Sequence, residues 1–197
     1  TWITIDQIGL VEGGLTKNKD KRKKYPIDVP YLRVANVYAN ELRLDDVKEI
    51  KVTESELERT TLEKGDMLVV EGNGGEKHIG RLAIWEGSID PCVHQNHLHK
   101  LRLINKNMNS YVLHWMLSAR AREFILCVSK TTSGLYTLSM TSLRQVPVPL
   151  PPEEELNEIV NRIEQKLSVQ KQIKKSLAQE QKRSSNLRQS ILKEAFE

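Results

Sequence analysis

The stretch Glu153–Glu197, EEELNEIVNRIEQKLSVQKQIKKSLAQEQKRSSNLRQSILKEAFE, decides how this chain is organised. It contains no Gly, Pro or Cys, and apolar residues recur in it at steps of three and four, which is the spacing of one helix face. The apolar stripe consists of Leu156, Val160, Ile163, Leu167, Ile173, Leu177, Leu187 and Ile191. At about 1.5 Å per residue the helix would reach roughly 65 Å, which is longer than the rest of the chain can cover. No other segment has this pattern, so we expect the stripe to lie against a second long helix in a partner.

The composition indicates one ordinary domain plus this extension. The chain has 197 residues, of which 39% are hydrophobic and 28% charged, and this is enough for a packed core. No apolar run approaches membrane-spanning length, and the first residues lack the charged-then-apolar order of a signal peptide. Cys92 and Cys127 are too few for a disulfide framework, so a reducing cytoplasm is the expected location.

The net charge of +4 favours a polyanionic partner. Glu153–Glu197 holds nine Lys and Arg against eight Glu, a net of +1, so residues 1–152 carry the remaining +3. In that first part the basic residues concentrate in residues 17–24, KNKDKRKK. Two interpretations of this run stay open: a solvated loop, or a set of contacts to phosphates.

Before the long helix, the patterns predict an α+β domain over residues 1–150 with a mixed or antiparallel sheet, because strands and helices do not alternate regularly. Strands are expected at residues 9–14, 28–37, 65–72, 81–85 and 92–104, and an edge strand ends the run 136–150. A capping box at Thr53 and Glu56 predicts a short helix, and Asn109 begins an apolar one. Pro152, followed by three Glu, starts the coiled-coil-forming helix of residues 151–197.

The glycine turn of residues 71–78, EGNGGEKH, is a candidate binding loop. It lacks the Gly-Lys-Ser/Thr ending of a nucleotide-binding loop, and an acidic residue stands where a phosphate would lie. Two interpretations remain. It is either a hairpin turn that needs positive φ, or a tight turn that displays Asn73, Lys77 and His78 to a polyanion or to base edges.

Cys92, His94, His97 and His99 have the composition of a metal site. On a strand, however, His97 and His99 share one face while Cys92 and His94 share the other, so no metal is predicted. The run from His94 to His97 instead offers side chains that can read base edges. The hydroxyl-rich loop of residues 131–136, TTSGLY, is either a plain connection or a set of phosphate contacts.

The sequence offers little for catalysis. No Ser or Cys nucleophile has a recognisable elbow or base, no S-adenosylmethionine motif appears, and no cofactor is expected. Glu49-Ile-Lys51, with Asp28 upstream, has the form used by metal-dependent nucleases. Such triplets also arise by chance, and a charged strand edge is the alternative.

Four ordered runs together resemble the specificity (S) subunit of Type I restriction-modification systems. They are VPYLRVANV at 29–37, GDMLVVEGNG at 65–74 continuing to IGR at 79–81, CVHQNH at 92–97, and TSGLY at 132–136 leading to VPVPLPP at 146–152. The ending LRQSILKEAF at 187–196 also looks like the close of a spacer helix in that family. The resemblance covers nearly the whole chain.

The resemblance implies a DNA target-recognition domain followed by one spacer helix. A complete S subunit contains two such units, whose helices pair antiparallel, set the distance between the two domains and carry two modification (M) subunits. Methyl transfer and cleavage belong to the M and restriction (R) subunits, so this chain is not expected to be an enzyme. It holds a single unit and starts at Thr1 without Met, which favours a half-subunit or a fragment.

We therefore expect a non-catalytic module that reads one half of a bipartite target in double-stranded DNA and forms a homodimer through its helix. Phosphate contacts are expected from Lys17, Lys19, Lys21, Arg22, Lys23, Lys24 and Arg33. Base readout is expected from Asn73, Lys77, His78, Arg81, His94, Gln95, Asn96, Thr132, Ser133 and Tyr136. Two other hypotheses stay open: a protein-interaction adaptor that never touches DNA, and a metal-dependent nuclease.

Overall fold

The structure is a computed structural model that describes residues 1–18, 22–72, 75–76, 78–132 and 135–196. It divides into two compact units, Thr1–Leu150 and Pro151–Glu197, and each is described by itself.

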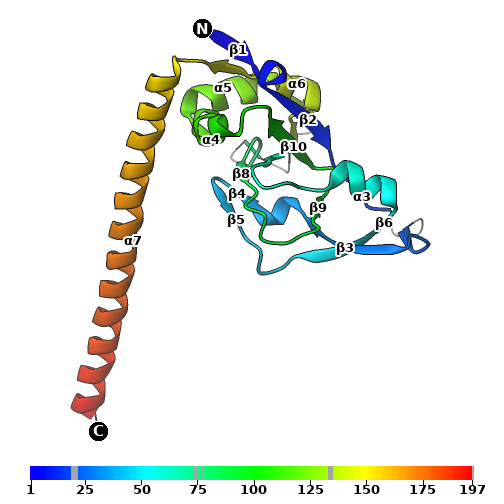
Figure 1. The fold of residues 1–197 in the computed structure, drawn as a ribbon. Coiled ribbons are helices and arrows are strands. Elements are labelled where there is room, and N and C mark those ends of the chain that lie inside the picture. Colours follow the sequence, from blue (N-terminus) through cyan, green and yellow to red (C-terminus); the bar gives the residue numbers. More distant parts are fainter. Residues whose placement is uncertain (19–21, 73–74, 77, 133–134, 197) are drawn as a thin grey trace. The chain divides into compact units, whose positions relative to one another are not determined.

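The first unit is built around an antiparallel four-stranded sheet with the order β2-β10-β7-β8 (Figure 1). The strands are β2 (Gly9–Gly13), β7 (Met67–Val70), β8 (Leu82–Ile84) and β10 (Leu98–Leu103). Leu101 of β10 lies opposite Val11 of β2 on one side and opposite Met67 of β7 on the other. Every residue of β7 is buried, in agreement with its continuous apolar sequence.

A second sheet has the order β6-β3-β9 and makes the architecture mixed, because β3 and β9 run parallel. Its strands are β3 (Ile27–Leu32), β6 (Lys48–Val52) and β9 (Val93–His94). Leu15, Val29, Val52 and Val93 are among the residues of its core. The larger core cluster includes Trp85, which is almost fully buried.

Three short strand pairs complete the sheets. They are β1 (Trp2–Thr4) with β13 (Pro147–Pro149), β4 (Val37–Tyr38) with β5 (Glu41–Leu42), and β11 (Lys130–Thr132) with β12 (Leu135–Thr137). The strand expected at the end of residues 136–150 is thus confirmed as β13, which pairs with β1 alone.

The helices of the first unit are short. They are α1 (Ile5–Ile8), η1 (Val34–Asn36), α3 (Glu54–Thr60), η2 (Lys106–Met108), α4 (Asn109–Leu117), α5 (Ala119–Val128) and α6 (Met140–Arg144). The predicted capping box is confirmed, since the Thr53 hydroxyl accepts from the Glu56 amide at 3.2 Å. The apolar helix expected after Asn109 is two helices, because the Ser118 hydroxyl accepts from the Ala121 amide and starts α5. Helix α6 was not predicted.

The second unit is the helix α7 (Glu153–Phe196), 44 residues long, as the periodicity predicted. Its burial falls steeply along the chain: Leu156 is buried, Val160 and Ile163 are half-buried, and every residue from Glu164 to Phe196 is exposed. The stripe side chains Ile173, Leu177, Leu187 and Ile191 are 62%, 58%, 61% and 56% exposed. None of the helices in the described ranges is long and apolar enough to cross a membrane.

Candidate functional site

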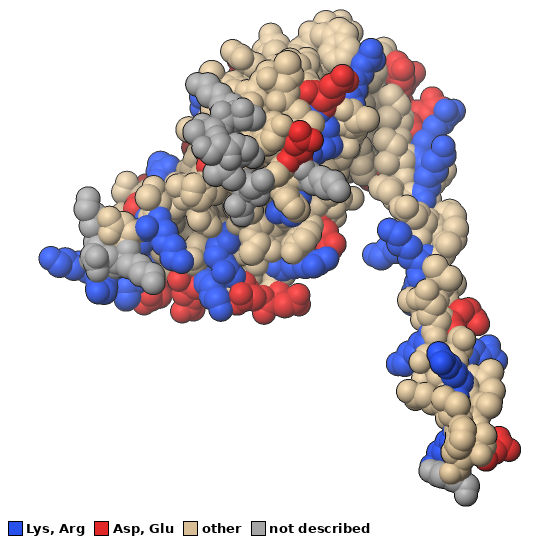
Figure 2. All heavy atoms as spheres, turned by 180° about the vertical axis from the view of Figure 1, so that it is seen from behind, with Lys and Arg blue, Asp and Glu red and all other residues tan. Residues whose placement is uncertain are grey.

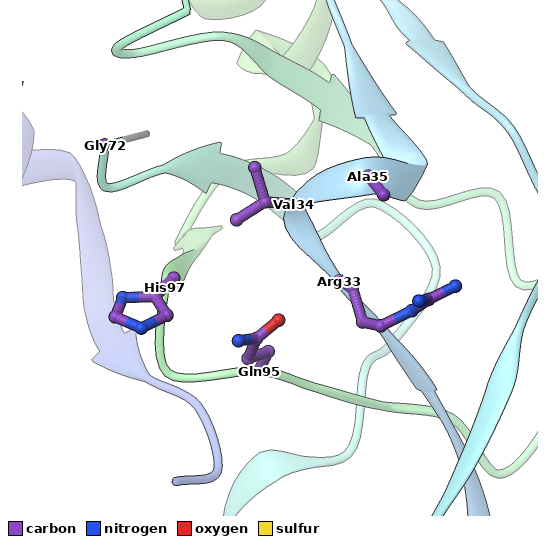
Figure 3. A pocket seen from close by; sticks show the side chains of 6 residues that line it. All are labelled: Arg33, Val34, Ala35, Gly72, Gln95 and His97. Atoms are coloured by element: carbon purple, nitrogen blue, oxygen red, sulfur yellow. The ribbon is translucent and has the colours of Figure 1, made fainter. Parts of the chain in front are cut away.

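A hollow of about 320 Å³ opens in the first unit where three distant parts of the chain meet. Its lining residues are Arg33, Val34, Ala35, Gly72, Gln95 and His97. In Figure 3 Gln95 and His97 come from one loop, while the guanidinium of Arg33 is directed away from His97. The hollow thus has two polar side chains from the β9–β10 loop and an apolar wall from η1.

Backbone hydrogen bonds hold the β9–β10 loop in place. The Gln95 amide donates to the Leu32 carbonyl at 2.9 Å, and the Asn96 amide donates to the Leu15 carbonyl at 3.0 Å. Gly14 is required beside this loop, because a Cβ there would collide with the carbonyl oxygens of His94 and Gln95. The loop therefore presents its side chains from a fixed backbone.

Glu71 and His97 are linked at both backbone and side chain. The Glu71 amide donates to the His97 carbonyl at 3.1 Å, and the His97 Nδ1 lies 2.8 Å from Glu71 Oε2. The Glu71 carbonyl in turn accepts from the Leu138 amide at 2.6 Å. A Cβ on Gly72 would collide with the Tyr136 carbonyl, so the chain leaves β7 at a position where only glycine fits.

His94, expected to read base edges, lies in the interior instead. It is fully buried, and its Nδ1 is 3.2 Å from the Thr60 carbonyl oxygen. Burial, assisted by the positive charge of Lys100, lowers the pKa of His94 to about 4. The imidazole is therefore neutral at physiological pH and offers no atom to the surface, so we correct its role from reader to core residue.

Arg22 is the second predicted contact residue that the fold takes inside. Its side chain is 9% exposed and donates to the Thr16 and Lys51 carbonyls at 2.9 and 2.8 Å. It also donates to Glu56 at 3.0 Å. With its donors engaged by the protein, Arg22 braces the basic loop rather than offering a charge to a phosphate.

The remaining cations of the predicted set differ in their surroundings. Lys17, Lys23 and Lys24 are exposed, while Lys19 and Lys21 lie outside the described residues. Arg33 donates to the Asp46 backbone and side chain at 2.7 and 2.9 Å.

Arg81 packs against an aromatic ring. Its guanidinium carbon lies 5.2 Å from the Tyr38 ring centroid, and that of Arg43 lies 4.0 Å from the same centroid. Burial lowers the pKa of Arg81, and its Nε is buried with no hydrogen-bond partner among the described residues. Arg81 thus takes part in the packing around the β4–β5 hairpin.

The turn after β7 is held by two other elements. Arg122 of α5 donates to the carbonyls of Ile79 and Glu76 at 2.9 and 2.8 Å. The Tyr136 hydroxyl donates to Glu76 Oε1 at 2.7 Å, and this hydrogen bond raises the pKa of Tyr136. His78 is exposed and Asn96 half-exposed. Asn73, Lys77 and Ser133, and the side chain of Thr132, lie outside the described residues.

Charges of both signs are mixed over the face shown in Figure 2. The nuclease-like triplet also takes part in a pairing of opposite charges, because Lys51 Nζ lies 2.9 Å from Asp28 Oδ2 across the β3–β6 pair. Within the part of the chain that the structure describes, no group of three His, Cys, Asp or Glu could hold a metal ion. The exposed Asp28–Lys51 pair is a charged strand edge.

Comparisons with known proteins point to one family. A family model described as the Type I restriction modification DNA specificity domain matches residues 2–183. The Type I restriction enzyme EcoKI specificity subunit of Escherichia coli (strain K12) is 34% identical over 176 residues, covering 85% of this chain and 36% of that protein. The StySPI specificity subunit of Salmonella potsdam is 29% identical over 170 residues, covering 86% and 37%. These relatives give no support to the adaptor or nuclease hypotheses.

Solved structures show the same fold. The HsdS subunit from Thermoanaerobacter tengcongensis superposes with a TM-score of 0.66 at 15% identity, covering 95% of this chain and 47% of that one. A chain from a study of complex assembly in the type I R-M system gives a TM-score of 0.70 at 16% identity, covering 100% and 49%. The chain therefore spans about a third of the length of these curated relatives and about half of each solved chain.

Proposed function

Because this chain belongs to the Type I restriction-modification DNA specificity family, we propose that it is a non-catalytic module that reads one half of a bipartite target in double-stranded DNA. The observation that carries the proposal is the family match from residue 2 to residue 183, which extends over the sheet unit and most of α7. In this function Thr1–Leu150 is the target-recognition domain and Pro151–Glu197 the spacer helix. Methyl transfer and cleavage belong to M and R subunits that assemble with it in the cytoplasm.

The helix pairs with the helix of a second copy. Burying one Leu or Ile contributes about 1.5–3 kcal/mol, and Ile173, Leu177, Leu187 and Ile191 are all more than half exposed. A helix with this repeat buries such a stripe against another helix of similar length. This chain covers 47% and 49% of the two solved chains, so two copies of it together have about the length of one such chain.

The pairing geometry explains how two identical modules read one site. An antiparallel two-fold pair places the two recognition domains at opposite ends of the helices. Each domain then meets one half-site, and the two half-sites are inverted copies separated by a gap. The helices are also the platform on which M subunits dock.

The two kinds of DNA contact come from different parts of the domain. Phosphate contacts come from the exposed Lys17, Lys23 and Lys24. Lys19 and Lys21 belong to the same proposed set. Base contacts come from the exposed or half-exposed residues His78, Gln95 and Asn96 and from the Asn73, Lys77 and Thr132–Tyr136 positions.

DNA binding across a salt series tests this function. The chain, assembled with its M subunit, is titrated with a random-sequence duplex from about 50 to 200 mM salt. Affinity should fall linearly on a double-logarithmic plot, because binding releases counterions from the phosphates. An assembly that binds no duplex even at the low end of the series would contradict the proposal and favour the adaptor hypothesis.

A further inference from the structure

We propose that His97 is a base-reading residue and that Glu71 is its positioning residue; this inference rests on the proposed function and names one of its specificity determinants. His97 lies in the run of side chains that can read base edges, and Glu71 opens the glycine turn of residues 71–78. In the structure the two residues are in direct contact through both backbone and side chain.

His97 has a defined position before DNA binds. The His97 backbone carbonyl accepts a hydrogen bond from the Glu71 amide at 3.1 Å, and the imidazole Nδ1 lies 2.8 Å from the Glu71 carboxylate. Glu71 is itself fixed by the Leu138 amide at 2.6 Å. A reader held in this way loses little rotamer freedom on binding.

The partner also determines which ring nitrogen carries the proton. An ionised carboxylate only accepts hydrogen bonds, so Nδ1 of His97 must donate to Glu71. In the neutral ring Nε2 then holds a lone pair and acts as an acceptor. The side chain is 53% exposed, and no residue in the described ranges occupies Nε2 with a hydrogen bond.

An acceptor of this kind matches one class of base edge. In the major groove the donors are the exocyclic amino groups, N4 of cytosine and N6 of adenine. Nε2 of His97 can accept from either of them, and it repels the guanine edge, which presents only the acceptors N7 and O6. We therefore assign to His97 a preference for an amino-bearing base.

The rest of the hollow suits a base pair. Gln95 lies on the same loop, and no hydrogen bond ties its carboxamide to the described residues, so it can bind an adjacent adenine through N6 and N7. Val34 and Ala35 form an apolar wall that can contact a thymine methyl group. Arg33 is not a reader here, because Asp46 holds its guanidinium.

A purely stabilising role explains the Glu71–His97 pair less well than base reading does. The Glu71 and His97 side chains are 25% and 53% exposed, and ion pairs at such sites contribute little to stability. The backbone hydrogen bond from the Glu71 amide to the His97 carbonyl does not depend on the identity of either side chain.

The test is selection from a random duplex library by the chain assembled with its M subunit, followed by sequencing. Wild type is compared with His97→Ala, with Glu71→Gln, and with the control Glu41→Gln, which removes an exposed ion pair to Arg43 on the β4–β5 hairpin. We expect His97→Ala to lose about ten-fold of the preference at one base pair of each half-site and to leave the other positions unchanged. Glu71→Gln should weaken the preference at the same base pair, because its amide can donate to Nδ1 and turn Nε2 into a donor. The control should give the wild-type motif.

The possible outcomes separate the two proposals. A wild-type motif that survives in both His97→Ala and Glu71→Gln would overturn the role of His97 while leaving the proposed function intact. Equal loss of preference at all positions, in a variant that keeps the wild-type unfolding midpoint, would also overturn it, because a residue that reads one base pair affects that position alone. A wild-type assembly that enriches no motif would overturn the proposed function, and this inference with it.

Discussion

Arg22 and Glu56 form an ion pair with a distance of 3.0 Å between Nη1 and Oε2, which ties the basic loop to the first turn of α3. The same Glu56 carboxylate accepts from the Thr53 amide at 3.3 Å in the capping box. One carboxylate thus holds both the start of a helix and the base of the loop. The buried Arg22 is therefore a structural residue, whereas Lys17 and Lys24 are exposed.

Replacing Arg22 should destabilise the domain. In Arg22→Ala, the Glu56 carboxylate and the carbonyls of Thr16 and Lys51 lose the hydrogen bonds that Arg22 donates, and we expect a loss of about 2–3 kcal/mol in the free energy of unfolding. The matched control Lys24→Ala should change it by less than about 0.5 kcal/mol, because that side chain is exposed. Urea unfolding measures both, and equal effects would contradict the assignment.

The exposed lysines should appear in the salt dependence of DNA binding. Each of Lys17→Ala and Lys24→Ala should reduce the slope of log affinity against log salt by about 1, because one released counterion is lost. His97→Ala is the control, since a base contact leaves the slope unchanged. If both lysine variants keep the wild-type slope, the basic loop does not contact phosphates.

Burial of His94 should make stability depend on pH. Its pKa is about 4 in the folded protein and 6.5 in the reference state, so the unfolded chain binds the proton more readily. The contribution of neutral His94 to the free energy of unfolding is complete above pH 6.5 and is lost as the pH falls toward 4. This contribution amounts to about 3 kcal/mol. Burial lowers the pKa of His99 as well, which adds to the same trend.

Urea unfolding from pH 7.5 down to pH 4 measures this dependence. Wild type should lose stability steadily below pH 6.5, and His94→Gln should show a shallower dependence over the same window. An unchanged slope in the variant would show that other groups cause the loss.

The helix stripe should determine the association state. Leu177→Asp places a charge on the stripe, and Gln179→Asp places the same charge about 200° around the helix. Each pair of chains loses two buried leucines in the first variant, about 3–6 kcal/mol, which raises the dissociation constant by roughly 10²- to 10⁴-fold. Light scattering at micromolar concentration should give the mass of two chains for wild type and Gln179→Asp, and of one chain for Leu177→Asp. A wild-type mass of one chain would contradict pairing.

The long helix could be predicted because its signal is local. A period near 3.6 without Gly or Pro, which opens with three Glu directly after Pro152, needs no tertiary information, and α7 begins at Glu153. The capping box at Thr53 and the apolar strand β7 are predictable for the same reason. The break between α4 and α5 was missed because Ser118 can lie inside a helix as well as cap one.

The site could be predicted only in part, because composition does not show which way a side chain points. Strand alternation was assumed from Cys92 to Ile104, but the chain turns at Gln95–His97 between β9 and β10. This turn buries His94 and exposes His97. Arg22 looks like its lysine neighbours in sequence, and only the fold brings Glu56 to it. Glu71 carried no signal, since its partner lies 26 residues away.

The most direct test of the central claim is the target selected from a random duplex library by the chain together with its M subunit. Two paired modules predict two inverted half-sites separated by a constant gap. The same selection with one heptad inserted after Gln170 should recover identical half-sites with a gap wider by about three base pairs, because seven residues add about 10 Å to the helix and one base pair spans about 3.4 Å. A selected pool with no enriched motif, or a gap of the same width with and without the insertion, would contradict the account.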